Sequence, residues 1–290
     1  MIYEDLTALV GNTPVVKYQG LYLKLESYNP TGSVKDRPML MMIKNLELVG
    51  MIKKGDTLIE ATSGNMGISL AFLASNLGYQ SCIIMPCNMS VERTKIIQAL
   101  GSEIIHTPSS EGMNGAIKKA KELASKPGFY YLNQFHNQAN ILAHEINTAP
   151  EIIADFDKLD YFISAIGTAG TITGVSKVLK EHYPNLSVIG VEPKESAILN
   201  GFEPGQHLIQ GIGAGFIPPL IDKTLINQVE MVSSFEAIEE MKLLWKTGLF
   251  VGISGASAIL VGKKILKINP KYIILIIVPD HGFKYLSVVS

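Results

Sequence analysis

Short apolar runs alternate along this chain with segments of helical period, and this alternation limits the folds open to it. The runs that read as buried strands are 58–60, 81–85, 103–106, 161–166, 188–191 and 273–278. Several are continuous, as is typical of parallel strands covered on both faces. Helical patterns lie between them at 68–77, 91–100, 113–124, 139–146, 172–181, 234–247 and 256–268. The order predicts an α/β protein with open, twisted, mainly parallel sheets and helices on both faces.

The composition narrows the classes of function. Of the 290 residues, 47% are hydrophobic and 18% are charged, which suits a well-filled core rather than a disordered chain. A net charge of −1 gives no basic excess for nucleic acid or anionic lipid. The longest apolar run, 272–278, is too short to span a bilayer. Because the first residues lack a signal-like stretch and Cys82 and Cys87 form no CxxC pair, we expect a cytoplasmic protein without a metal or membrane partner.

One lysine stands in an unusual setting. Lys35 follows the turn-forming sequence Asn-Pro-Thr-Gly-Ser-Val and opens an apolar helical segment from Pro38 onward. A lysine held at the mouth of a cleft can have a lowered pKa, and its free amine can form a Schiff base. The alternative is an ordinary lysine on a solvated face at a helix start. The other motifs of the chain favour the chemical role.

Glycine-containing turns join strand-like runs to helical ones at 62–67 and 167–171, and similar turns occur at 210–216 and 252–255. Backbone amides at a helix start favour anions, so 167–171 is a candidate phosphate cradle and 62–67 a candidate carboxylate site. A structural turn or an ordinary helix cap remains the alternative at each. A dinucleotide site using Glu192 is a weaker alternative, because the glycines do not follow G-x-G-x-x-G.

Taken together, these motifs resemble the pyridoxal-phosphate (PLP) enzymes of the cysteine synthase, or O-acetylserine sulfhydrylase, and cystathionine β-synthase family. The resemblance runs from Gly11-Asn12-Thr13-Pro14 to Tyr285-Leu286-Ser287. It implies fold type II (tryptophan synthase beta-like), with PLP in the cleft between two α/β domains. A smaller mobile domain at 39–147 would carry the carboxylate loop. Residues 1–38 and 148–290 would form a larger domain with Lys35, the phosphate cradle and Ser254.

The resemblance also assigns roles to residues. Lys35 would bind the PLP aldehyde and then take the substrate's α-proton as general base. The other cofactor-binding residues would be Asn65 at the ring hydroxyl, Gly167, Thr168, Ala169, Gly170 and Thr171 at the phosphate, Ser254 at the ring nitrogen, and Asp280 near that nitrogen. The substrate-binding residues would be Thr62, Ser63, Gly64, Met66, Gln134 and Gly211. The histidines other than His281, with His144 among them, are interpreted as surface or structural residues.

Several positions depart from the family pattern. Met66 stands where threonine is usual, which removes a hydroxyl donor and adds bulk. Ala169 replaces a glycine, although a small residue is expected to fit. The order Gly255-Ala256-Ser257 after Ser254 differs from the usual Ser-Gly-Ala. Asp280 resembles the enzymes that make cystathionine rather than cysteine.

The predicted reaction is β-replacement on O-acetyl-L-serine or a related β-substituted alanine, through an α-aminoacrylate, with sulfide as nucleophile and L-cysteine as product. Serine at the ring nitrogen suits β-elimination and disfavours transamination. One alternative keeps this first half-reaction, with homocysteine giving cystathionine, or cysteine giving serine and hydrogen sulfide. Another is a non-catalytic binding protein with the same fold, which Lys35, Asn65 and Ser254 argue against. A homodimer is expected from the resemblance alone.

Overall fold

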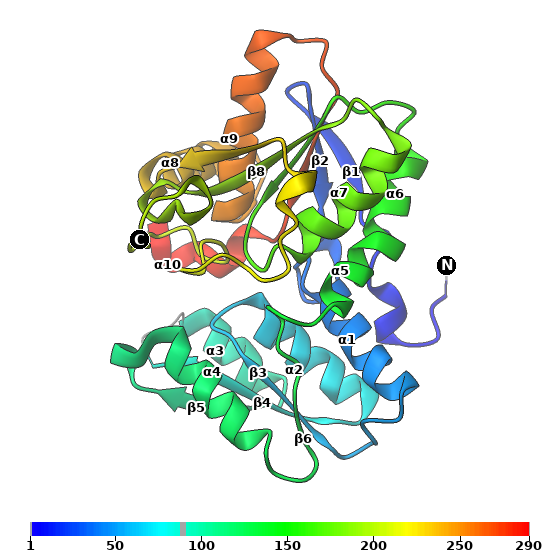
Figure 1. Ribbon diagram of the computed structural model, residues 1–290, viewed down its shortest axis with the longest axis vertical. Helices are drawn as coiled ribbons and strands as arrows, with labels where there is room; N and C mark the ends of the chain where they lie inside the picture. Colours follow the sequence, from blue (N-terminus) through cyan, green and yellow to red (C-terminus); the bar gives the residue numbers. More distant parts are fainter. Residues whose placement is uncertain (1, 88–90, 290) are drawn as a thin grey trace. The chain divides into compact units, whose positions relative to one another are not determined.

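The computed structural model describes residues 2–87 and 91–289, which fall into two compact units. The first unit comprises Met1–Val10 and Lys35–Asn140, and the second comprises Gly11–Val34 and Ile141–Ser290. Each unit is an α/β structure built around its own sheet (Figure 1). The domain boundaries expected from the sequence, 39–147 against 1–38 plus 148–290, concern domains that move and stay a prediction.

The first unit has a four-stranded, fully parallel sheet in the order β5-β4-β3-β6. Its strands are β3 (Thr57–Ala61), β4 (Gln80–Pro86), β5 (Glu103–Thr107) and β6 (Phe129–Tyr131). Its helices are α1 (Asp36–Leu48), α2 (Asn65–Leu77), α3 (Val91–Ala99) and α4 (Gly112–Leu123). Helix α4 packs with alternate residues of β3 and β4, whereas α1, α2 and α3 share a separate apolar cluster. The sheet is therefore covered on both faces, which explains its continuous apolar strands.

The second unit has a six-stranded sheet in the order β1-β2-β10-β7-β8-β9, in which only the β1–β2 pair is antiparallel among the described strands. Its strands are β1 (Val15–Tyr18), β2 (Leu21–Leu25), β7 (Tyr161–Ala165), β8 (Ser187–Pro193), β9 (Gln228–Val232) and β10 (Ile274–Val278). Its helices are α6 (Ala149–Asp155), α7 (Gly170–His182), α8 (Ser234–Lys246), α9 (Ile253–Ile268) and α10 (Leu286–Val289), and α5 (Ala139–Ala143) begins in the first unit. Helices α8 and α9 pack in one apolar cluster, and α6 and α7 pack in another.

The predicted fold class is confirmed, and the sequence missed four strands for identifiable reasons. β1, β6 and β9 are edge strands with partly exposed residues, so none is a continuous buried run. β2 contains Lys24, which is only 1% exposed and pairs with Glu151 at 2.7 Å. The helix expected at 139–146 consists of α5 and a π-helical turn (His144–Thr148) that leads directly into α6. Pro150 does not interrupt this path, because it lies in the first turn of α6, where proline is tolerated.

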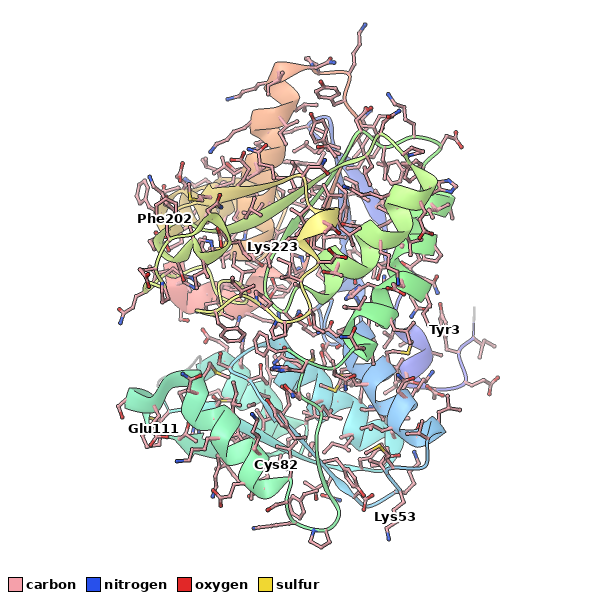
Figure 2. The ribbon with its side chains drawn as sticks, in the orientation of Figure 1. Tyr3, Lys53, Cys82, Glu111, Phe202 and Lys223 are labelled. Atoms are coloured by element: carbon pink, nitrogen blue, oxygen red, sulfur yellow. The ribbon has the colours of Figure 1, made fainter. Side chains whose placement is uncertain are left out.

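The two cysteines lie in different surroundings. Cys82 lies on β4 inside the first unit, whereas Lys53 and Glu111 lie at its surface (Figure 2). Burial, together with the charge of Glu103, raises the pKa of the Cys82 thiol to about 12, so this thiol is inert. Cys87 is exposed. Within the described residues, no helix is long and apolar enough to cross a membrane, and no cluster of metal-ligating side chains occurs.

Candidate active site

Lys35 occupies the N-cap position of α1 and is partly buried. The backbone before it is fixed within the second unit, because the Val34 N–H donates to the Pro279 carbonyl at 2.8 Å. The buried Lys284 ammonium donates to the Thr31 carbonyl at 3.0 Å. The lysine therefore follows a stretch of chain that is anchored on the segment after β10.

The residue after Lys35 links the first two helices of the first unit. Asp36 is fully buried, and its carboxylate accepts a hydrogen bond of 2.5 Å from the Ser69 hydroxyl on α2. Ser69 lies one helical turn after Asn65, the first residue of α2. The start of α1, where Lys35 lies, is thus tied to the start of α2 within one unit.

The turn before α2 has the form of an anion site. Gly64 is the N-cap in an extended conformation, and no side chain caps this end of the 13-residue helix. The Thr62 hydroxyl accepts from the Gly64 N–H at 3.2 Å, and the Thr62 N–H donates to the Ile84 carbonyl. Ser63 and Asn65 are partly exposed in this turn. The first amides of α2 and the helix dipole therefore favour an anion here.

Met66 and Gln134 lie close to this turn but face different surroundings. The Met66 side chain is 1% exposed and belongs to the apolar cluster of the first unit, so it fills the core. Gln134 is buried, and its backbone carbonyl accepts a hydrogen bond from the Asn140 side-chain amide at 2.8 Å. Its side-chain amide donates to the Glu60 carboxyl group at 3.3 Å. The added bulk of Met66 is therefore accommodated in the core.

The second unit offers another uncapped helix start at 167–171. Ala169 is the N-cap of the 13-residue helix α7, has φ +67°, and makes no side-chain capping bond. The buried Thr168 hydroxyl accepts weakly from the Gly170 N–H at 3.4 Å. Ala169 thus adopts a left-handed conformation that favours glycine.

Gly167 is held against the segment that contains Gly211. A β-carbon at Gly167 would lie 2.5 Å from the Gly211 carbonyl oxygen, so no other residue fits without a shift. Gly211 itself is exposed and has φ +91°. The Gly213 N–H donates to the Ile166 carbonyl at 3.3 Å, which joins the two segments directly.

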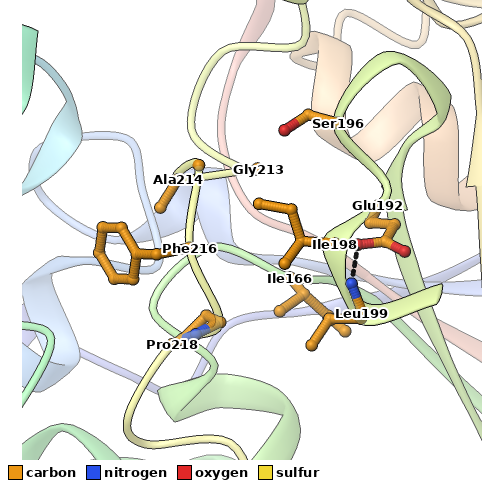
Figure 3. A pocket seen from close by; sticks show the side chains of 10 residues that line it. Ile166, Glu192, Ser196, Ile198, Leu199, Gly213, Ala214, Phe216 and Pro218 are labelled. Carbon is orange, nitrogen blue, oxygen red and sulfur yellow. Dashed lines mark hydrogen bonds between the residues drawn. The ribbon is translucent and has the colours of Figure 1, made fainter. Parts of the chain in front are cut away.

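A pocket opens beside this junction and contains Glu192 (Figure 3). The Glu192 carboxylate accepts from the Leu199 and Asn200 backbone amides at 3.0 Å each, and from the Asn200 side chain at 2.7 Å. These contacts use the oxygens that a ribose would need, which disfavours the dinucleotide alternative. The pocket is lined by Ile166, Glu192, Ser196, Ile198, Leu199, Gly213, Ala214, Gly215, Phe216 and Pro218.

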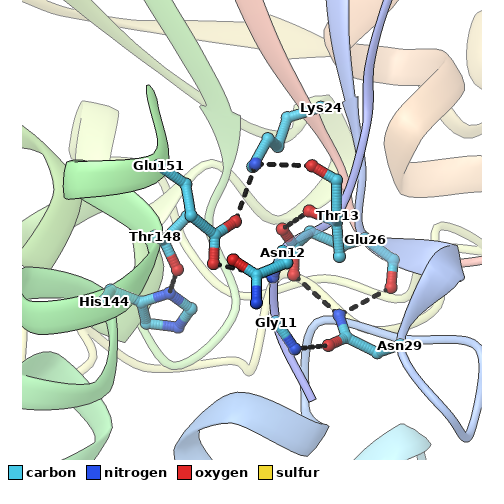
Figure 4. A network of polar contacts seen from close by, with 9 residues as sticks. All are labelled: Gly11, Asn12, Thr13, Lys24, Glu26, Asn29, His144, Thr148 and Glu151. Carbon is cyan, nitrogen blue, oxygen red and sulfur yellow. Dashed lines mark hydrogen bonds and ion pairs between the residues drawn. The ribbon is translucent and has the colours of Figure 1, made fainter. Parts of the chain in front are cut away.

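His144 contacts the candidate phosphate site, a role that the sequence did not reveal. It is 1% exposed, and its Nδ1 lies 2.9 Å from the Thr148 hydroxyl (Figure 4). Its Nε2 lies 3.1 Å from the Thr171 hydroxyl in the first turn of α7. The π-helical turn places both contacts on one ring. The spacing of histidines gave no sign of this role, because the contact depends on tertiary structure.

Ser254 lies in the first turn of α9, after the N-cap Gly252. It is 4% exposed, and its hydroxyl makes no hydrogen bond within the described part of the chain. Asp280 is buried beside Gly252, where a β-carbon would lie 1.9 Å from an Asp280 carboxylate oxygen. The Tyr285 hydroxyl donates to the other Asp280 oxygen at 2.7 Å, and the Ser33 backbone forms a bridge with Asp280. Asp280 thus joins the start of α9 to the segment before Lys35.

Comparison with known proteins shows the family of the chain. A family model described as "Pyridoxal-phosphate dependent enzyme" matches residues 6–280. The chain belongs to this family. A cysteine synthase of Staphylococcus aureus is 42% identical over 98% of this chain and 96% of its own length. A cysteine synthase of Flavobacterium is 47% identical over 87% of this chain and 85% of its own length.

Solved structures of several enzymes match nearly the whole chain. The Entamoeba histolytica cysteine synthase has a TM-score of 0.95 and 38% identity, covering 99% of this chain and 90% of that one. A hydrogen sulfide-producing enzyme of Fusobacterium nucleatum has a TM-score of 0.94 and 38% identity, covering 98% and 100%. The O-acetylserine-dependent cystathionine β-synthase of Helicobacter pylori has a TM-score of 0.93 and 40% identity, covering 99% and 98%.

The residues present fit PLP. The cofactor carries an aldehyde, a phosphate and a ring nitrogen, and its substrates add a carboxylate. The uncapped start of α7, with the Thr168 and Thr171 hydroxyls, offers donors of the kind that bind a phosphate. The Ser254 hydroxyl has no hydrogen bond among the described residues, and Lys35 is the candidate amine.

Proposed function

We propose that this PLP-dependent enzyme catalyses β-replacement on O-acetyl-L-serine, with sulfide as the nucleophile and L-cysteine and acetate as products. The observation that carries the proposal is 42% identity to a cysteine synthase over 98% of the chain. When bound, PLP supplies an electron-withdrawing ring that acidifies the α-proton of an attached amino acid. The protein's own residues then determine which proton moves and which ligands are held.

In this proposal, Lys35 binds the cofactor aldehyde and afterwards takes the α-proton as general base. Because the backbone before it is anchored through Val34 and Lys284, its amine returns to the same place after each transfer. Such positioning is a large part of catalysis by a single base.

The two uncapped helix starts would hold the two anions. Gly167–Thr171 would bind the cofactor phosphate, with His144 fixing the Thr171 hydroxyl. The turn of Thr62, Ser63, Gly64 and the Met66 amide would bind the substrate carboxylate, with Gln134 as a further donor and Gly211 lining the approach. Asn65 would contact the ring hydroxyl. Donors without charge orient these anions and leave the amine of Lys35 as the reactive group.

Ser254 would face the ring nitrogen and direct the choice of reaction. Its hydroxyl can share a hydrogen bond there but places no negative charge beside the nitrogen, so it does not stabilise a protonated ring as an aspartate does. The ring is then a weaker electron sink, which favours β-elimination over transamination. Asp280 would act mainly by holding Gly252 and thereby the first turn of α9; direct contact with the cofactor is a further prediction.

A second candidate function keeps the β-elimination and changes one partner. Either homocysteine replaces sulfide as the nucleophile and gives cystathionine, or cysteine replaces O-acetyl-L-serine and reacts with water to give serine and hydrogen sulfide. Asp280 resembles the cystathionine-forming enzymes at this position. The cystathionine β-synthase of Helicobacter pylori is 40% identical and supports the same alternative.

The decisive experiment offers sulfide and homocysteine together to the PLP-loaded enzyme with O-acetyl-L-serine and quantifies both products. An excess of cysteine is expected. An excess of cystathionine would move the enzyme to the second function, and hydrogen sulfide release from cysteine alone would point to the lyase reaction.

We further propose that the enzyme is a cytoplasmic homodimer, with a smaller mobile domain at 39–147 and a larger domain formed by 1–38 and 148–290. The small-molecule chemistry and the two unpaired cysteines support the location. Sedimentation of the holoenzyme tests the dimer.

A further inference from the structure

Glu60 is a buried acid that the proposed mechanism leaves unused. It lies on the central strand β3, is 0% exposed, and forms no ion pair among the described residues. One carboxyl oxygen, Oε1, is 3.5 Å from the Gln134 backbone nitrogen and 3.3 Å from the Gln134 side-chain nitrogen. The other oxygen, Oε2, has no partner within the described part of the chain. A buried carboxyl group without a cation is costly, so its retention calls for a reason.

The position of Glu60 connects it with the proposed carboxylate site. β3 runs directly into the turn that contains Thr62 and Gly64. The chain after β6 passes alongside, because the Leu132 N–H donates to the Ile59 carbonyl at 3.0 Å. Gln134 is thus held on one side by Glu60 and on the other by Asn140. Both contacts lie inside the first unit.

No cation pairs with Glu60 among the residues that the structure describes. Ile83 lies opposite on β4, and α2 and α4 contribute apolar residues such as Met66 and Ala116 to the clusters around β3. Tyr131 on β6 is the titratable neighbour, and burial together with the Glu60 charge raises its pKa. Burial raises the pKa of Glu60 from 4.5 to about 8, against the opposing effect of the Gln134 hydrogen bonds. At neutral pH the group is therefore mostly uncharged.

We propose that Glu60 is a positioning residue for the substrate carboxylate: its uncharged carboxyl group holds Gln134 beside the start of α2. The inference rests on the proposed function of this turn. A second negative charge at Glu60 would repel the arriving carboxylate and disfavour its binding. Substrate binding is then linked to the protonation of Glu60, and substrate affinity falls when Glu60 ionises.

The test compares Glu60→Gln with Glu60→Ala. Glutamine keeps an oxygen acceptor for Gln134 and imitates the uncharged acid, so kcat/KM for O-acetyl-L-serine at pH 7 stays within about threefold of wild type. Alanine removes the contact and raises KM by about tenfold, with a smaller change in kcat. An unchanged KM in folded Glu60→Ala would overturn the proposal.

The pH profile separates positioning from a merely structural role. One pH unit above its pKa, about nine-tenths of Glu60 is ionised, so wild-type kcat/KM at pH 9 falls roughly tenfold relative to Glu60→Gln. Because both enzymes use the same substrate, titration of the substrate amine cancels in the ratio. Parallel profiles for the two enzymes would contradict the proposal.

A measurement without turnover keeps this inference distinct from the proposed function. The folded state holds the Glu60 proton between pH 4.5 and 8 while the unfolded state loses it, so this acid lowers stability as pH rises through that window. The wild-type melting temperature should therefore fall relative to Glu60→Gln by about 2 °C per pH unit. If O-acetyl-L-serine is not a substrate but this trend appears, the proposed function is wrong, whereas the uncharged state of Glu60 is still supported. If the melting temperatures of wild type and Glu60→Gln change in parallel with pH, the uncharged state of Glu60 is refuted.

Discussion

Helices α2 and α7 begin alike and differ in what surrounds their first turns. Each has 13 residues, and neither start is capped by a side chain. At α7, His144 fixes the Thr171 hydroxyl, and Gly167 leaves no room beside Gly211. At α2, the buried acid Glu60 holds Gln134 instead. One start is framed by closely packed groups, and beside the other lies an acid whose pKa burial raises to about 8.

This difference matches the two proposed ligands. A cofactor phosphate stays bound through many turnovers, so fixed donors and close packing serve it. A substrate carboxylate arrives and leaves in every cycle, so a site that responds to charge can bind it reversibly. The same backbone feature, a helix start without a side-chain cap, thus forms two proposed anion sites with different properties, because the residues around the two helix starts differ.

The largest effect is expected from a change that alters neither helix start. Lys35→Ala removes the proposed base and the covalent attachment of PLP, so kcat falls by at least about 10³-fold. Steady-state assays with O-acetyl-L-serine and sulfide measure it. Lys44→Ala, at an exposed position on the same helix, is the control and keeps wild-type activity. Activity in Lys35→Ala close to that of the control would remove Lys35 from the mechanism.

A substitution in the proposed phosphate loop should weaken PLP binding. The β-carbon of Gly167→Ala would meet the Gly211 carbonyl at 2.5 Å, so the loop must shift and the Kd for PLP rises more than about tenfold. Fluorescence titration of apoenzyme with PLP measures the change. Gly201→Ala is the control, because Gly201 has φ +86° but nothing within 4 Å of the added carbon. Equal PLP affinity in both variants would contradict the proposed cradle.

A substitution at the proposed carboxylate site should leave PLP binding unchanged and weaken substrate binding. Gln134→Leu removes a buried amide donor, so KM for O-acetyl-L-serine rises about tenfold while the Kd for PLP stays constant. Gln98→Leu, at an exposed position on α3, controls for the added apolar group. If PLP binding weakened as much as substrate binding, the division between the two sites would not hold.

The smallest effect concerns Ala169. Its φ of +67° disfavours alanine, so Ala169→Gly should raise the free energy of unfolding by about 0.5–1 kcal/mol. Urea unfolding of the apoenzyme measures the change. A matched Ala143→Gly substitution, at a helical position with φ −55°, should lower stability by a similar amount. A loss of stability in Ala169→Gly would show that the backbone strain is relieved elsewhere.

Sequence reasoning reached the fold class because the core strands are continuous apolar runs. It missed three edge strands, β1, β6 and β9, because their residues are partly exposed. It missed the internal strand β2 because Lys24, which pairs with Glu151, interrupts the apolar pattern. It left the effect of Met66 open, and the structure places this side chain in the core. Neither His144 nor Glu60 stood out, because their significance depends on contacts with Thr171 and Gln134 that only the folded chain creates.

The most direct test of the central claim is the visible absorption spectrum of the PLP-loaded enzyme before and after addition of O-acetyl-L-serine. We predict a band of lysine-bound cofactor that shifts when the substrate is added and returns when sulfide follows, with one cysteine formed for each acetate released. A cofactor band that does not change when O-acetyl-L-serine is added would contradict the proposed substrate. A protein that binds no PLP would contradict the proposed PLP-dependent function.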